Sequence, residues 1–109
     1  MVARVASFEG VNVQEAERTM GEAESIIRTL LENLAGYQGH LELVSSNGKV
    51  LSITLFDSEE NAQAAEQTFD EEMPRQLGDL FKGWEGRRVS VDRTTCSPTH
   101  AASDEHSGA

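Results

Sequence analysis

His40 is the residue of this chain best suited to proton transfer, because an imidazole at its ordinary pKa exchanges a proton near neutral pH. It begins a stretch of alternating apolar and polar residues, which is typical of a β-strand with one buried face. At such a position a histidine can act as the general base of a small-molecule site. The alternative is a partly exposed histidine that hydrogen-bonds to the backbone of a turn.

Hydroxyl and aromatic side chains close to His40 in the predicted fold could complete such a site. Tyr37 could orient a ligand through its hydroxyl, or it could instead pack over the end of a helix. Ser52 and Thr54 could contribute hydroxyls, although their presence also fits ordinary strand propensity. Trp84 could line the mouth of a pocket, or it could anchor the core or a subunit interface. The candidate site is therefore His40 as the base, with a pocket formed by Tyr37, Ser52, Thr54, Phe56 and Trp84.

Other kinds of chemistry have little support in the sequence. The C-terminal stretch holds four potential metal ligands, but their spacing matches no zinc signature: Cys96, His100, Asp104 and His106. The sequence contains no glycine-rich phosphate loop, no Cys-x-x-Cys pair and no nucleophile elbow. We therefore expect neither a metal nor an organic cofactor.

Composition and charge limit the class of protein. A chain of 109 residues with 38% hydrophobic content fits a single soluble domain, and it has no apolar run long enough to span a membrane. The net charge of −10 argues against nucleic acid or an anionic membrane as a partner, because both require a basic surface. The N-terminus shows no signal peptide, and one cysteine, Cys96, is compatible with a reducing compartment. We expect a cytoplasmic location.

The clearest structural signal is a β-hairpin over residues 40–56. A three-residue loop, Ser46-Asn47-Gly48, would place the large aliphatic residues on one face, pairing Leu43 with Leu51 and Leu41 with Ile53. A two-residue Asn-Gly turn would not place these aliphatic residues opposite one another. We expect the three-residue loop, with Gly48 in the left-handed region as a bulge.

Two helices and two further strands are predicted around the hairpin. Residues 2–8 form a short strand, and a helix capped by Asn12 follows, ending before Gly36. Its apolar stripe has helical spacing: Ala16, Met20, Ala23, Ile27, Leu30 and Leu34. A second helix starts at Asp57 or Ser58 and carries the stripe Ala62, Ala65, Phe69 and Met73. Pro74 should break it, with a shorter helix over residues 75–81. Residues 87–93 form the last strand, and residues 94–109 form a solvated tail.

The order strand, helix, strand, strand, helix, strand indicates an α+β, ferredoxin-like fold over residues 1–93. Both helices would cover one face of a four-stranded antiparallel sheet. We expect the other face to carry His40, Glu42, Val44, Val50, Ser52, Thr54 and Phe56. Its two valines and one phenylalanine would need a cover, and a second copy of the chain is the simplest one.

The run GYQGHLELVSSNGKVLSITLFDSEENAQAAEQ, residues 36–67, resembles the dimeric α+β barrel superfamily. The matching features are the Gly-Tyr-Gln-Gly start, the hairpin and the Asp-Ser-Glu-Glu helix start, and the resemblance extends over about residues 2–93. It is most similar to proteins with an antibiotic biosynthesis monooxygenase domain. The resemblance implies a homodimer in which two sheets pack face to face, with a small-molecule pocket in each subunit.

The resemblance further implies a cofactor-independent monooxygenase that acts on a small aromatic or polyketide-like compound. A haem-degrading branch of the superfamily has its proximal histidine on the second helix, and residues 58–81 contain no histidine. Because one fold hosts unrelated chemistries, a non-catalytic small-molecule-binding or structural dimer is the alternative.

Overall fold

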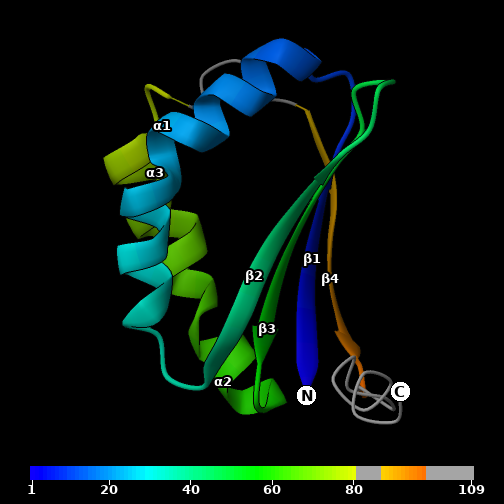
Figure 1. The fold of residues 1–109 in the computed structure, drawn as a ribbon. Helices are drawn as coiled ribbons and strands as arrows, with labels where there is room; N and C mark the ends of the chain where they lie inside the picture. The colour runs from blue at the N-terminus through cyan, green and yellow to red at the C-terminus, as the bar shows by residue number, and fades with distance from the viewer. Residues whose placement is uncertain (81–86, 98–109) are drawn as a thin grey trace, which may run out of the picture.

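The computed structural model describes residues 1–80 and 87–97 and has the predicted ferredoxin-like fold (Figure 1). Four antiparallel strands form one sheet in the order β2-β3-β1-β4, with the helices on one face. The elements in chain order are β1 (Val2–Phe8), α1 (Val13–Glu32), β2 (Tyr37–Val44), β3 (Val50–Phe56), α2 (Glu59–Ala64), a π-helical segment η1 (Thr68–Glu72), α3 (Met73–Leu77) and β4 (Arg88–Thr95).

The hairpin of β2 and β3 has the predicted register. Leu41 pairs with Ile53 and Leu43 pairs with Leu51. The amide of Ser45 donates to the carbonyl of Lys49 at 2.9 Å, which closes the expected three-residue loop. Gly48 has φ +85°, and a Cβ built on it would lie 2.6 Å from the carbonyl oxygen of Val11. Glycine is therefore required at this position both for its backbone angle and for the close approach of the segment before α1.

Helix α1 begins as predicted, because the Asn12 side chain accepts a hydrogen bond from the amide of Glu15 at 2.9 Å. The predicted stripe faces the sheet, although the most deeply buried positions shift partly off it: Ala16, Thr19, Ala23 and Leu31. Gly36, in the turn before β2, has φ +75°, which is the left-handed conformation expected there.

The second helical region is broken near Pro74, as predicted, but the break takes the form of a widened π-helical turn at Thr68–Glu72. Proline has no amide hydrogen and its ring crowds the carbonyl four residues before it, so a regular α-helix cannot continue through this point. The following helix α3, Met73–Leu77, includes Pro74 in its first turn and starts earlier than expected. It ends before Gly78, where a Cβ would meet the carbonyl oxygen of Pro74 at 2.6 Å.

The prediction for the two faces of the sheet was wrong. Val50, Thr54 and Phe56 are 0–1% exposed beneath the helices, whereas Leu41 and Leu43, on the other face, are 43% and 48% exposed. The face with His40 is therefore the covered one, and the open face carries the aliphatic residues Leu41, Leu43, Leu51, Ile53 and Leu55. Strand alternation shows which residues share a face, but the helical crossovers decide which face is covered.

The C-terminal boundary also differs from the prediction. β4 continues to Thr95, two residues beyond the expected end, and the amide of Cys96 donates to the carbonyl of Met1 at 2.9 Å. The rest of the predicted tail, residues 98–109, and Trp84 lie outside the described residues. In the part of the chain that the structure describes, no helix is long and apolar enough to cross a membrane.

Candidate functional site

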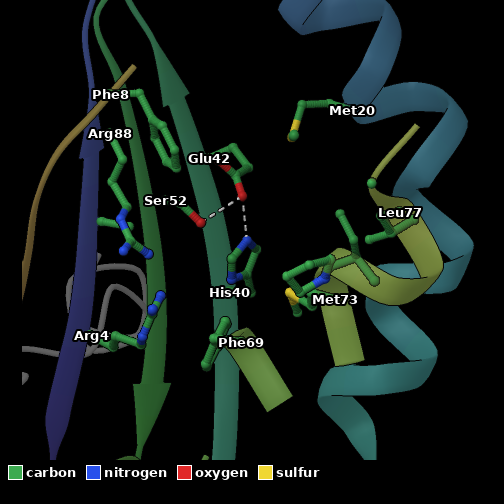
Figure 2. A pocket seen from close by; sticks show the side chains of 14 residues that line it. Arg4, Phe8, Met20, His40, Glu42, Ser52, Phe69, Met73, Leu77 and Arg88 are labelled. Atoms are coloured by element: carbon green, nitrogen blue, oxygen red, sulfur yellow. Dashed lines mark hydrogen bonds and ion pairs between the residues drawn. The ribbon is translucent and has the colours of Figure 1, made fainter. Parts of the chain in front are cut away.

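A cavity of about 430 Å³ lies between the covered face of the sheet and the helices (Figure 2). Its helical wall is mainly apolar and comes from α1, η1 and α3: Met20, Ile27, Phe69, Met73 and Leu77. Its sheet wall is mostly polar and comes from all four strands: Arg4, His40, Glu42, Ser52 and Arg88, with Ala6 and Phe8 between them. An apolar cavity of this size with a few convergent polar groups suits a small organic ligand.

Strand register explains how these polar side chains come together. Ser52 lies between Ala6 and Glu42 on neighbouring strands, and Thr54 lies between Arg4 and His40. Two adjacent rows of the covered face therefore bring the acid, the imidazole and both hydroxyls to one side of the cavity. Ala6, 3% exposed, is the small residue in the middle of the sheet wall and leaves the space above it free.

His40 is held at both ring nitrogens. Nε2 lies 2.6 Å from Oε1 of Glu42, and Nδ1 lies 2.8 Å from Oγ1 of Thr54. An ionised carboxylate can only accept hydrogen bonds, so Nε2 carries a proton beside Glu42. In the neutral imidazole Nδ1 is then the acceptor from the Thr54 hydroxyl. The ring is fixed in orientation, and Glu42 and His40 form one hydrogen-bonded pair.

Glu42 has a carboxylate oxygen that no described residue hydrogen-bonds. Its Oε1 also accepts a hydrogen bond from Ser52 Oγ at 2.9 Å, whereas Oε2 is buried and has no partner among the described residues. The side chain is 19% exposed and lines the cavity. A buried carboxylate oxygen without a hydrogen bond is unfavourable, so a bound hydroxyl that donates to it would be stabilised.

Arg4 is the second buried charge of the site. It is 4% exposed, its Nε donates to Glu66 Oε1 at 2.8 Å, and its guanidinium carbon lies 3.8 Å from the centre of the Phe69 ring. Arg93 approaches the same oxygen of Glu66 at 3.8 Å and also pairs with Glu59 at 2.7 Å. The ion pair and the ring together hold the Arg4 guanidinium against the cavity wall.

The structure brings some of the sequence-predicted site residues together and separates others. His40 and Ser52 line the cavity. Thr54 is not part of the lining, but it hydrogen-bonds to His40. Phe56 instead belongs to a core cluster with Val2, Ala62 and Ala65. Tyr37 pairs with Phe56 at the start of β2 and does not line the cavity.

Burial raises the pKa of Tyr37 above its ordinary value, and the nearby Glu32 carboxylate adds to this effect. This environment favours the neutral phenol. Tyr37 is half-buried at the start of β2, outside the lining of the cavity.

Sequence reasoning missed the charged residues of the cavity, and it placed most of the helical wall on inner helix faces without assigning it to a cavity. Arg4 and Glu42 could have been noticed, because each is a charged residue at a strand position that shares the parity of the less exposed residues. Arg88 gave no such signal, since it is exposed and lies beside the irregular pairing of β1 and β4. Phe69 and Met73 were predicted to face inwards, but their place in a cavity wall depends on the π-helical turn.

Comparison with known proteins shows what this chain is similar to in structure. No protein-family model matches the sequence, and no curated protein matches it. Many solved structures have a similar fold, among them three that match 90% or more of this chain. The monooxygenase ActVA-Orf6 of Streptomyces coelicolor, in complex with nanaomycin D, is 15% identical with a TM-score of 0.68, covering 92% of this chain and 90% of that chain.

The second is the cofactor-independent oxygenase SnoaB of Streptomyces nogalater, at 12% identity and a TM-score of 0.58, covering 90% of this chain and 94% of that chain. The third is a dimeric ferredoxin-like protein from an uncultured marine organism, at 16% identity and a TM-score of 0.66, covering 92% of this chain and 96% of that chain. Identities this low establish a shared fold. Structures described as antibiotic biosynthesis monooxygenases share this ferredoxin-like fold as well, which confirms the predicted resemblance at the level of the fold.

Proposed function

We propose that this protein is a cofactor-independent monooxygenase that oxidises a small hydroxylated aromatic or polyketide-like compound in the cavity beneath the helices. The observation that carries the proposal is the His40–Glu42 pair, which lines a mainly apolar cavity and whose buried Glu42 Oε2 has no hydrogen-bond partner among the described residues. The shared fold with two oxygenases supports it.

The reaction needs a base and a dry pocket. A hydroxyarene or an enolised anthrone would donate its hydroxyl proton to Glu42 Oε2, which leaves an electron-rich anion. The anion would pass electrons to dioxygen and form a carbon–oxygen bond, giving a hydroperoxide at the carbon that held hydrogen. Loss of water then gives the carbonyl product, so that one CH₂ and one O₂ become one C=O and one H₂O. The apolar helical wall would keep bulk water away from the anion.

In this proposal Glu42 takes the proton and His40 positions Glu42. The Nε2–H of His40 donates to Glu42 Oε1 at 2.6 Å and so holds the carboxylate while Oε2 takes the proton, and Thr54 keeps the ring in place. Ser52 donates to the same carboxylate and so holds it towards the cavity.

Oxygen uptake with a panel of quinols and anthrones tests the proposal. We expect uptake by the parent protein and a loss on the order of a hundredfold or more in Glu42→Gln and in His40→Ala, because the proton acceptor or its partner is removed. Glu60→Gln, an exposed change in the first turn of α2, is the matched control and should keep full activity. Equal uptake in the parent and in both cavity variants would remove the pair from the reaction.

We further propose that the protein is a homodimer formed through the open face of the sheet. Leu41 and Leu43 are about half exposed there, and Leu51, Ile53 and Leu55 continue the same face. A contiguous aliphatic surface of this kind is unfavourable in water and is typical of a protein interface. One of the structures with this fold is a dimeric ferredoxin-like protein, which supports the proposal.

A further inference from the structure

Arg4 has more hydrogen-bonding capacity than its protein partners use. A guanidinium has five N–H groups, and among the described residues only Nε of Arg4 has a hydrogen-bond partner, Glu66. The residue is 4% exposed and lines the cavity, so a ligand bound in the cavity could accept hydrogen bonds from the remaining donors. Fixed, planar, charged donors of this kind match the geometry of a carboxylate.

A second arginine lies at the same side of the cavity. Arg88 on β4 lines it, and Figure 2 shows the Arg4 and Arg88 side chains pointing toward one another along the sheet. The acid–base pair is on the other side, because His40 and Glu42 belong to β2, and β3 separates β2 from β1. Two strand spacings, about 10 Å, therefore separate the backbones that carry Arg4 and His40.

The cavity thus has two chemically different ends joined by an apolar wall. Glu66 balances one positive charge at the arginine end, but Glu66 also interacts with Arg93, and Arg88 adds a further positive charge. Glu42 is the only acidic side chain among the described residues that line the cavity. The arginine end therefore favours an anionic group, and the Glu42 end favours a hydrogen-bond donor.

We propose that the compound bound in this cavity is an aromatic carboxylic acid, whose carboxylate is held by Arg4 with help from Arg88. This inference rests on the proposed function for the other end of the compound, where a hydroxyl would meet Glu42. The ring system would lie between the two ends against Phe69, Met73 and Leu77.

Calorimetry in the absence of oxygen can measure the binding of three naphthalene probes at pH 7.5. It tests this inference separately from turnover. The probes are 2-naphthoate, its methyl ester and 2-naphthol. We expect the parent protein to bind 2-naphthoate at least tenfold more tightly than the ester, since only the acid can pair with Arg4. Equal affinity for acid and ester, or no binding of either, would overturn the inference, and this comparison needs no variant.

Variants then assign the effect to the arginine end. Arg4→Gln should weaken 2-naphthoate binding tenfold or more and change 2-naphthol binding less than twofold, and Arg88→Gln should give a smaller loss for the acid alone. Arg4→Lys, which keeps the charge beside Glu66, is the variant to use if Arg4→Gln does not fold. It should lose part of the preference for 2-naphthoate over the methyl ester. An equal loss for both probes would contradict a carboxylate site at Arg4.

The two proposals can fail independently. Carboxylate-dependent binding without oxygen uptake on the panel would support this inference and count against the monooxygenase. Oxygen uptake with neutral hydroxyarenes, together with equal binding of acid and ester, would support the monooxygenase and contradict the carboxylate site.

Discussion

The two faces of the sheet have opposite chemistry. The face beneath the helices carries His40, Glu42, Ser52 and Thr54, whereas the open face of the same two strands carries leucine and isoleucine. In a monomer one would expect the more apolar face to be covered by the helices. The arrangement is explained if each face serves a different purpose, with the covered face enclosing a polar site and the open face packing against another chain.

The difference between the two faces shows that apolar residues on a strand indicate a buried face. They do not indicate whether helices of the same chain or another chain bury it. The covered face has its own core at the two ends of the cavity, where Phe56 packs with Val2 and where Val50 packs with Val11 and Ala16. Between these clusters the polar residues of the cavity are tolerated because they bond to one another.

The largest expected effect is at the core of the covered face. Phe56 is 0% exposed, so Phe56→Ala should lower the free energy of unfolding by about 3–5 kcal/mol and the melting temperature by about 10 °C or more. Phe56→Leu, which keeps most of the side-chain volume, should cost much less. Thermal melts followed by circular dichroism give the comparison, and a loss under about 1 kcal/mol would mean that the covered face has been wrongly assigned.

The next effect is on assembly. Leu43→Asp on the open face should raise the dimer dissociation constant about a hundredfold or more, because the charge enters the interface from both copies. Light scattering at micromolar concentration should show a dimer for the parent and for the exposed control Gln63→Asp, and a monomer for Leu43→Asp. A parent protein that is monomeric at high concentration would remove the explanation for the open face.

Much of the fold follows from local sequence signals. The Ser46-Asn47-Gly48 loop fixes the hairpin register, and Asn12 and Ser58 fix the helix starts through side-chain caps that the structure contains. These signals are predictive because each depends on neighbours within a few residues.

The site was less predictable because it depends on contacts between distant segments. Arg4 and Glu66 are 62 residues apart in sequence, and the cavity wall near Phe69 depends on a π-helical turn that no simple periodicity indicates. The covered and open faces of the sheet were predicted the wrong way round for the same reason, because the helices that cover one face are distant in sequence from the hairpin. His40 and Thr54 were recognised as candidates from their residue types, but the hydrogen bonds that join His40 to Thr54 and to Glu42 were not predicted.

The smallest effect concerns Tyr37, whose pKa burial raises. Its pKa is raised in the folded state, so above about pH 10 the unfolded chain loses this proton more readily than the folded one. Stability from Tyr37 is then fully present below the ordinary pKa and is lost as pH rises towards the folded-state pKa. Tyr37→Phe should therefore make the fall in melting temperature between about pH 9.5 and 11 shallower, and identical slopes would contradict this environment.

The assignment of the two faces is tested most directly by methyl-group NMR during titration with 2-naphthoate. Methyl groups on opposite sides of one sheet report separately on the cavity and on the open face. We predict saturable shifts for Met20, Ile27, Met73 and Leu77, with those of Leu41, Leu43, Ile53 and Leu55 unchanged. Shifts confined to the open-face methyl groups would contradict the account, because the ligand would then bind where a second subunit is proposed.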